Sequence, residues 1–583
     1  MVPMLKSIRR WRVAALALSF LSPFALSAVH SGDGLRVKGF TDYEALHGVH
    51  WHPPGVGHND VRTVSPSADL GPVTPEAAAT PRAECGPGSQ PEPGRQGRVP
   101  LSDYENGRAE RPYTCNTELV AHHGITGGFQ VHRYIDRAGR ECAFYDSSLL
   151  VGKDIPKGVE PGVYVLDMSD PTRPVRTAAL QSPAGLSPHE SLRLNTERGL
   201  LAMNMGTATT LPGFVDVYDV SEDCRHPVLR SSLPLSLGGH EGGFSPDGRT
   251  YWVTTTAAPG ITAVDLSDPS TPSIVWQTFD YAVHGLSISS DGTRAYLAQV
   301  GDFVTTTTSG AGGLVILDVS EVQARAPDPT VREVGQLTWP EVSIPQNNIP
   351  VTINGVKHLI QFDEYDTNVF GNDPGDVVGG VHVIDISDET KPLIVSRIRL
   401  EVHQQEARAT DQQADPGNQR SGQGYAAHYC AVPREIEPGM VACSMIVSGL
   451  RIFDIRDPAQ PREVAYFNQP LVSGPDPSER GAYAMSAPAF VSERGEVWYS
   501  DSNTGFFNVR LTGEPEALLR GSPAGAPADQ PQQPAVLGAQ QEAAAPTNRE
   551  GLPATGVGTA TATAGCTALI AALALRRGRR RTA

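Results

Sequence analysis

One short phrase recurs along the middle of the chain, and it constrains the fold more than any other feature. Each copy is an alternating, β-rich run that ends in aspartate, followed by an apolar residue, serine or arginine, and a polar turn; VYVLDMSDP at 163–171 is an example. Successive aspartates are between 46 residues (Asp219 to Asp265) and 69 residues (Asp385 to Asp454) apart. Repeats of this length are typical of blades in radial β architectures. The six aspartates are Asp167, Asp219, Asp265, Asp318, Asp385 and Asp454.

A second element precedes several copies of this phrase. The segment GFSPDGRTYWVTT at 243–255 holds two alternating runs around Asp247-Gly248, and similar segments lie at 287–299 and 491–502. Such dipeptides accept the positive φ of a tight hairpin turn, so each segment predicts two antiparallel strands. Together with the phrase and a short run after it, each unit holds four strands.

These units predict an all-β fold, a single seven-bladed β-propeller over 111–513. The seventh phrase is degenerate, FFNVRLTG at 506–513, with Arg510 in the aspartate position. A six-bladed ring and an irregular sandwich are the alternatives. The segment NTELVAHHG at 116–124 resembles the fourth strand of other units, so we expect it to complete the last blade and close the ring.

The repeated phrases VYVLD, LVILD and VHVID resemble the LVIVD-repeat family, whose name describes this pattern. The resemblance covers roughly residues 115–513 and implies a β-propeller. It implies no particular activity, because the function of the family is poorly defined.

Both ends of the chain carry sorting patterns. Residues 1–28 place arginines before a short apolar run and small residues, which is typical of a secretory signal peptide. Near the other end, a pentapeptide precedes an apolar stretch at 557–575 and an arginine-rich tail. The pentapeptide consists of Leu552, Pro553, Ala554, Thr555 and Gly556.

This order resembles the LPXTG cell-wall sorting signal of Gram-positive surface proteins and indicates an actinobacterial protein. The resemblance implies that a sortase-type transpeptidase cuts between Thr555 and Gly556 and joins Thr555 to a cell-wall peptide. The chain then enters the membrane only transiently, through its C-terminal apolar segment. We therefore expect a secreted protein that is covalently attached to the cell wall.

Composition divides the rest of the chain. Residues 29–110 form a predicted low-complexity N-terminal arm, 514–551 a Pro/Ala/Gln-rich linker, and 552–583 the sorting segment. Few large apolar side chains are available in the arm and the linker to offset the entropy of ordering, so both are expected to be disordered. The net charge of −17 repels phosphate, which argues against nucleic acid as a partner.

The cysteines fit an exported protein. Six of the seven remain once Cys566 is removed with the sorting segment, and an even number suits disulfides. Cys430 and Cys443 flank a predicted hairpin turn, PREIEPG, so they form a candidate disulfide across two strands. The pairing of the other four is left open.

Histidines recur where the first strand of a unit begins. In a propeller this strand lines the central channel, so residues at its start should ring one mouth of the channel. Neutral imidazoles there could bind copper or zinc, with Glu190 and Glu241 as general bases. The alternative is a structural role, in which the histidines bond neighbouring loops. The candidate ligands are His189, His240, His284 and His428.

Other units offer different residues at this position: Gln346, Asn347 and Asn348 in the fifth and Ser486 in the seventh, while His122, His123 and His132 lie near it in the first. The repeated aspartates are expected to cap turns. A weaker calcium candidate consists of Asp363, Glu364, Asp366 and Asp373, and the stretch HGVHWHPPGVGH at 47–58 is a weaker transition-metal candidate.

Three functions follow from these patterns. We favour a wall-anchored binding or adhesion module that presents loops to an unknown extracellular ligand. An exported metal-dependent enzyme with a histidine-lined channel is the alternative, and a structural surface protein is the third.

Overall fold

The computed structural model describes residues 77–521, apart from 148–158, 207–212, 257–258, 301–311, 340–342, 366–377, 411, 417–423 and 472–483. The signal peptide, the LPXTG-like pentapeptide, the stretch 47–58, Asp366 and Asp373 lie outside the described residues. All described residues belong to one compact unit, Met1–Val536. No helix within the described ranges is long and apolar enough to cross a membrane.

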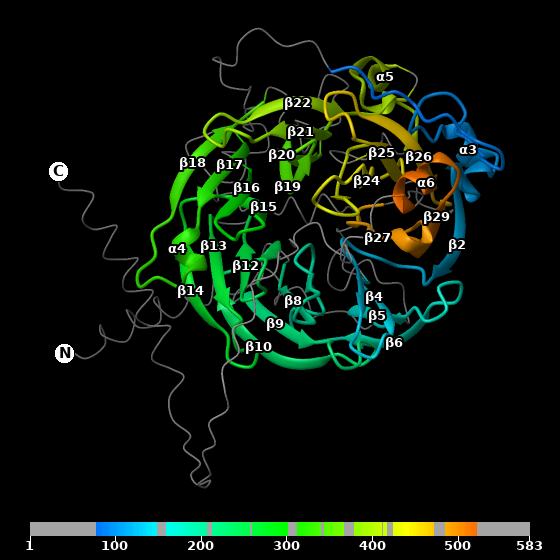
Figure 1. Ribbon diagram of the computed structural model, residues 1–583. Coiled ribbons are helices and arrows are strands. Elements are labelled where there is room, and N and C mark those ends of the chain that lie inside the picture. Colours follow the sequence, from blue (N-terminus) through cyan, green and yellow to red (C-terminus); the bar gives the residue numbers. More distant parts are fainter. Residues whose placement is uncertain are drawn as a thin grey trace, which may run out of the picture. The chain divides into compact units, whose positions relative to one another are not determined.

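Seven antiparallel sheets follow one another around a ring (Figure 1). Blade one consists of β3 (Val131–Ile135), β4 (Glu141–Asp146), β5 (Val163–Asp167) and β6 (Val175–Leu180), and blade two of β7 (Arg193–Asn195), β8 (Leu200–Asn204), β9 (Gly213–Asp219) and β10 (Val228–Ser236). Blade three consists of β11 (Gly242–Phe244), β12 (Thr250–Thr254), β13 (Ile261–Asp265) and β14 (Ser273–Thr278), and blade four of β15 (Val283–Ile288), β16 (Arg294–Gln299), β17 (Gly313–Asp318) and β18 (Arg332–Leu337). Blades five to seven are β19 (Ile344–Ile353), β20 (Val356–Glu364), β21 (Val381–Asp385) and β22 (Leu393–Ile398); β23 (Cys430–Ala431), β24 (Met440–Ser444), β25 (Leu450–Asp454) and β26 (Arg462–Asn468); and β27 (Ala489–Val491), β28 (Glu496–Asp501), β29 (Gly505–Leu511) and β2 (Thr117–His123). The seven-bladed β-propeller is therefore confirmed, and the six-bladed alternative is wrong.

The last blade takes its outermost strand from the N-terminal side of the propeller. Strand β2 pairs antiparallel with β29, with Leu119 opposite Val509. The predicted closure of the ring by residues 116–124 is thus confirmed. Just before it, β1 (Tyr113–Cys115) pairs with β26 and adds a fifth strand to blade six.

The blades bury their faces on one another. Strand β5 is buried at four of its five positions, whereas β6 is fully buried only at its last residue. Val215 and Val217 of β9 belong to the same apolar cluster as Phe244, Tyr251 and Val264 of the next blade. A single four-stranded sheet could not bury this surface alone, so the stability of each blade depends on its neighbours.

The repeated aspartates cap turns, as expected. The carboxylate of Asp167 accepts the backbone N–H of Ser169 at 2.9 Å and its hydroxyl at 2.6 Å. Asp318 accepts the same two groups of Ser320 at 3.0 and 2.6 Å. The hydrogen bonds of Ser320 lower the pKa of Asp318 to about 2. Each aspartate thereby fixes the turn that leads from the third strand of its blade to the fourth.

The folded body begins before residue 111, the boundary expected from composition. Residues 77–110 contain the short helix α3 (Leu101–Glu105) and a 3-10 turn, η1 (Arg108–Glu110). Val99 and Ala109 pack in one cluster with Tyr466 of β26. Buried Arg451 of β25 forms ion pairs with Glu92 and, at 2.9 Å, with Glu463. Composition does not predict this segment as folded, because buried ion pairs hold it to the propeller in place of long runs of apolar side chains.

The folded body also extends past residue 513. Helix α6 (Glu514–Arg520) follows β29 directly, and its Leu519 is buried in one cluster with Val509 and Leu511. Other short helical segments are α4 (Ser320–Gln323), α5 (Gln405–Ala409), η3 (Glu401–His403) and η6 (Ser492–Arg494).

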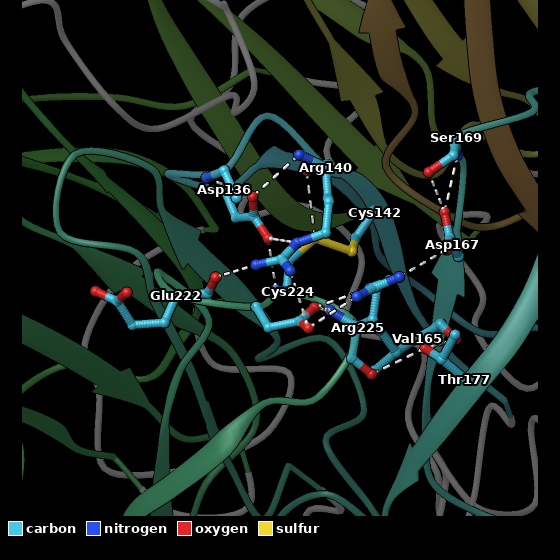
Figure 2. The surroundings of a disulfide bond; sticks show 12 residues. Asp136, Arg140, Cys142, Val165, Asp167, Ser169, Thr177, Glu222, Cys224 and Arg225 are labelled. Atoms are coloured by element: carbon cyan, nitrogen blue, oxygen red, sulfur yellow. Dashed lines mark hydrogen bonds and ion pairs between the residues drawn. A yellow bond between two sulfur atoms is a disulfide. The ribbon is translucent and has the colours of Figure 1, made fainter.

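Three disulfides connect the described cysteines: Cys85–Cys115, Cys142–Cys224 and Cys430–Cys443. Cys430 lies directly opposite Cys443 in the pairing of β23 with β24, at a Cα separation of 4.0 Å. The Cys142–Cys224 bond instead joins β4 of blade one to the turn after β9 of blade two (Figure 2).

Charged residues surround the Cys142–Cys224 bond (Figure 2). Asp136 accepts the backbone N–H of Cys224 at 3.1 Å and the Nε–H of Arg140 at 2.7 Å. Arg225 lies 3.6 Å from Asp167 across the same blade interface. Covalent and ionic contacts therefore hold the first two blades together.

We predict that replacing Cys142 and Cys224 by serine lowers the free energy of unfolding by about 4.5 kcal/mol, because 82 residues separate the two cysteines and their bond restricts the unfolded chain. The matched control is the Cys430→Ser/Cys443→Ser variant, whose 13-residue separation predicts a loss of about 3 kcal/mol. Guanidinium unfolding of both variants measures the difference. A larger loss in the control would contradict the entropic explanation.

Acid unfolding tests the turn caps. The folded-state pKa of Asp318 is about 2, below the unfolded value of about 3.9, so the carboxylate stabilises the fold above pH 4. This stabilisation is lost as the pH falls through the folded-state value. In urea unfolding from pH 7 to pH 2, Asp318→Asn should be less stable than wild type by a constant amount above pH 5. The gap should shrink to a small remainder between pH 4 and pH 2, and a gap at pH 2 as large as that at pH 7 would contradict the prediction.

Candidate metal centre

The four histidines identified from the sequence lie together at the axis of the ring. His189, His240 and His428 come shortly before the inner strands β7, β11 and β23, and His284 is the second residue of β15. Each side chain is at most 2–3% exposed. The four histidines therefore form a buried cluster and do not line the open channel mouth that the sequence led us to expect.

Two imidazoles and two carboxylates form the centre of the cluster. Nε2 of His240 lies 3.0 Å from Nε2 of His284. An Oε2 atom from Glu190 lies 3.3 and 3.4 Å from these two nitrogens. Glu364, the last residue of β20, places Oε1 3.0 Å from Nε2 of His284. All four side chains are buried, so these donor atoms converge in a volume that water reaches little.

His428 is fixed by a backbone contact. Its Nδ1 lies 2.7 Å from the carbonyl oxygen of Met485, so Nδ1–H donates to this carbonyl and Nε2 is the nitrogen that faces the cluster. Nε2 faces Oε2 of Glu364 at 3.2 Å and Oε1 of Glu190 at 3.5 Å. A hydrogen bond that fixes the tautomer in this way is typical of metal-binding histidines.

An unusual backbone conformation places His189 and Glu190 together. Successive side chains in extended chain point to opposite sides, yet ligand atoms of both residues lie within 4.8 Å of one another and of one from His240. His189 has a φ of 51°, in the left-handed region that non-glycine residues avoid. Such strain is concentrated at functional sites.

The remaining blades supply other side chains. In blade five, Gln346 Nε2 donates to Oε1 of Glu190 at 3.1 Å and lies 2.9 Å from Nε2 of His428. In blade one, Phe129 stacks on His428 and meets His189 edge-on. Candidate ligands thus come from blades two to six, and an aromatic wall from blade one.

Charges within the cluster are coupled. Burial raises the pKa of Glu190, but the positive charge of His284 and His189 outweighs it and holds this pKa well below its ordinary value. Burial likewise opposes ionisation of Glu364, whose pKa its contacts with His284 nevertheless lower. Burial lowers the pKa of His284, but the charges of Glu190 and Glu364 outweigh it and raise this pKa to about 9. Burial and the charge of His284 lower the pKa of His240. The buried negative charges of Glu190 and Glu364 therefore favour the presence of positive charge at the axis.

A second layer lies beside this cluster. Oε1 of Glu241 accepts hydrogen bonds from Arg193 at 2.6 Å, from Asn347 at 2.6 Å and from the hydroxyl of Tyr429. Burial is the main reason that the pKa of Glu241 is raised to about 7. Glu241, expected as a general base next to a metal, is thus held mainly by neighbouring side chains, while Glu190 faces the histidines.

Other sequence candidates lie elsewhere. His122 and His123 are in β2, the outermost strand of blade seven. Nε2 of His132 lies 2.8 Å from the carbonyl oxygen of Leu192, and the hydroxyl of Ser486 donates to the carbonyl of Ser500.

The weak calcium candidate is divided by the structure. Asp363 accepts a hydrogen bond from Nε1 of Trp339 at 2.8 Å, whereas its neighbour Glu364 faces His284 and His428. Glu364, a weak calcium candidate in the sequence, thus belongs to the histidine cluster instead. Its position at the end of a second strand, next to the start of the first, was the signal that could have connected it to the histidines.

No family model matches the chain, and no curated protein matches it. Solved structures with a similar arrangement include a protein of unknown function from Desulfotomaculum acetoxidans (12% identity, covering 61% of this chain and 92% of that one, TM-score 0.38). Others are the periplasmic gluconolactonase PpgL of Pseudomonas aeruginosa (12%, 58% and 85%, 0.38) and the Cps50 (Swd1) β-propeller domain of Myceliophteria thermophila (9%, 68% and 100%, 0.42). At these values the likeness assigns no activity to this chain.

The close approach of Glu241 to Gly285, the residue after His284, can be tested by substitution. A Cβ on Gly285 would overlap Oε2 of Glu241 and would lie 2.6 Å from the backbone oxygen of Gln346, so Gly285→Ala must displace the Glu241 side chain and also shift backbone. We predict that this variant loses about 1–3 kcal/mol of stability, as overpacked cores do. Thermal unfolding measures it, and Glu241→Ala with the Gly285→Ala/Glu241→Ala variant is the control. Because the double variant removes the overlapping carboxylate, it should lose less stability than the two single variants together. If Gly285→Ala unfolds like wild type, the close approach is wrong.

Proposed function

We propose that this propeller is an exported metalloprotein that holds a divalent transition-metal ion, copper or zinc, at its axis. The observation that carries the proposal is the convergence of Nε2 of His240, Nε2 of His284, Oε2 of Glu190 and Oε1 of Glu364. Nε2 of His240, Nε2 of His284 and Oε2 of Glu190 lie 3.0 to 3.4 Å from one another, and Oε1 of Glu364 lies 3.0 Å from Nε2 of His284.

These separations fit ligands that share one ion. Donor atoms about 2.1 Å from an ion lie about 3.0 Å apart at right angles and about 3.4 Å apart at tetrahedral angles. The fit supports the metal role over the structural one, because histidines that merely bond neighbouring loops need not direct their Nε2 atoms at each other. His189 is placed to add a further nitrogen, since its ligand atom groups with those of Glu190 and His240.

The donor set selects the kind of metal. Imidazole nitrogens suit zinc, copper, iron and nickel, whereas calcium and magnesium prefer sites made wholly of oxygen. A buried zinc ion with these ligands would supply Lewis-acid chemistry, and copper would also supply electron transfer. Glu190 and Glu364 would serve as anionic ligands, and the hydrogen bond of His428 to Met485 would orient a neighbouring imidazole.

Export and wall attachment belong to the same proposal. Three disulfides among the described residues favour an oxidising, extracellular location. The LPXTG-like pentapeptide supports attachment by a sortase-type transpeptidase in a Gram-positive organism, and the aspartate-ended phrases support membership of the LVIVD-repeat group. The binding or adhesion function stays a prediction, and the metal centre does not support it.

Metal analysis of the purified full chain tests the proposal. After exposure to Cu²⁺ or Zn²⁺ and removal of excess ion, we expect stoichiometric metal by mass spectrometry, with nitrogen and oxygen ligands at about 2.0–2.1 Å by X-ray absorption. The His240→Gln/His284→Gln variant should lose this metal.

The matched control is His132→Gln, which changes a buried histidine whose Nε2 faces the backbone of Leu192 instead of the cluster. It should bind as much metal as wild type, and circular dichroism should show that both variants are folded. Folded wild type that binds neither ion, or a double variant that retains its metal, would refute the proposal.

A further inference from the structure

We infer that the axis holds two metal ions, bridged by the carboxylates of Glu190 and Glu364. This inference rests on the proposed function and deepens it, because it adds a second cation site on the His428 side of the cluster. The arrangement of the individual carboxylate oxygens carries it.

Each carboxylate directs its two oxygens to different histidines. Glu190 presents Oε2 to His240 and His284, at 3.3 and 3.4 Å, and Oε1 to His428 at 3.5 Å. Glu364 presents Oε1 to His284 at 3.0 Å and Oε2 to His428 at 3.2 Å. Two carboxylates therefore span the same two groups of nitrogens, which is the arrangement of bridging ligands between a pair of ions.

One ion could not use all these donors. Four histidines and two carboxylates offer at least six ligand atoms, whereas zinc sites generally take four, and catalytic ones at most five. Two groups of donors, each with its own imidazole and one oxygen from each carboxylate, divide the set without leaving buried donors unused. Ion pairs in proteins are commonly about 3.5–4 Å apart, a distance that a bridging carboxylate spans.

The second site adds a histidine of its own. Glu190, Glu364 and His428 place one ligand atom each within 4.8 Å of one another, and this group shares only Glu190 with the group of His189, Glu190 and His240. The bond from Nδ1 of His428 to Met485 leaves Nε2 as the coordinating atom. The amide of Gln346 also faces this group, with Nε2 3.1 Å from Oε1 of Glu190 and 2.9 Å from Nε2 of His428. Its oxygen is buried and accepts no hydrogen bond from any described residue, so a rotation that exchanges the amide nitrogen and oxygen would offer that oxygen as a fourth ligand.

The surroundings limit the second ion to this position. Phe129 lies against His428, with ring centroids 5.5 Å apart, and closes the side toward blade one with an apolar face. An ion there meets nitrogen and oxygen on the side of blades two, five and six. The second site has fewer imidazole donors than the first, so we expect it to bind its ion more weakly and to fill after the first.

Copper titration of the full chain separates one ion from two. Wild type, stripped with a chelator and titrated with Cu²⁺, should bind two equivalents, and the electron paramagnetic resonance signal should lose intensity through magnetic coupling as the second equivalent binds. His428→Gln should bind one equivalent and give the full signal of an isolated Cu²⁺. Gln346→Leu should keep the first equivalent and weaken the second by about tenfold or more. Phe129→Leu, which changes only the apolar wall, is the matched control and should bind two.

The outcomes distinguish this inference from the proposed function. Wild type that binds one equivalent with an uncoupled signal overturns the second ion and leaves the first in place, whatever His428→Gln binds. Wild type that binds none overturns both. Because His428 is buried, Gln346→Leu provides an independent measurement should His428→Gln fail to fold, and a second equivalent of unchanged affinity in that variant would remove Gln346 from the site.

Discussion

The pairing of β2 with β29 is the contact on which the rest of the structure depends. It joins residues almost 400 positions apart, Thr117 to Leu511, and it is the bond that turns a row of blades into a ring. Only in a closed ring does blade one meet blade seven, where Gln130 bridges to Ala487. The carbonyl of Met485, which orients His428, lies in the chain that leads into that last blade. The orientation of this candidate ligand is thus set across the interface between blades six and seven.

Much of this fold could be predicted because each blade repeats a local rule. The aspartate at the end of the third strand fixes a turn through bonds to a residue two positions later, and Gly248 and Gly292 adopt the positive φ that their hairpins need. Such signals act over a few residues, so a single sequence contains them completely. The position of the histidines followed from the same reasoning, since the start of an inner strand must lie near the axis.

The carboxylates could not be predicted in the same way. Glu190 reaches the cluster only because His189 adopts a left-handed conformation, and no local sequence pattern indicates that φ. Glu364 reaches it because β19 and β20 are the longest inner pair, ten and nine residues, which brings Ile344 opposite Glu364 near the axis. The folded segment 77–110 was missed for a related reason, since its contacts with β25 and β26 join residues more than 300 positions apart.

A ring of similar blades does not make a metal centre unless the blades differ. Seven identical side chains at the axis would compete for one small volume, and seven imidazoles would supply no negative charge for an ion. Here the position after the histidine varies: Glu190 turns toward the cluster, Glu241 is held by Arg193, and Gly285 has no side chain where Oε2 of Glu241 lies. Because the residue at this position differs between blades that keep the same antiparallel pairing, the axis can be polar and asymmetric while the sheets stay regular. The specificity of the site therefore resides in side chains that the fold itself does not require.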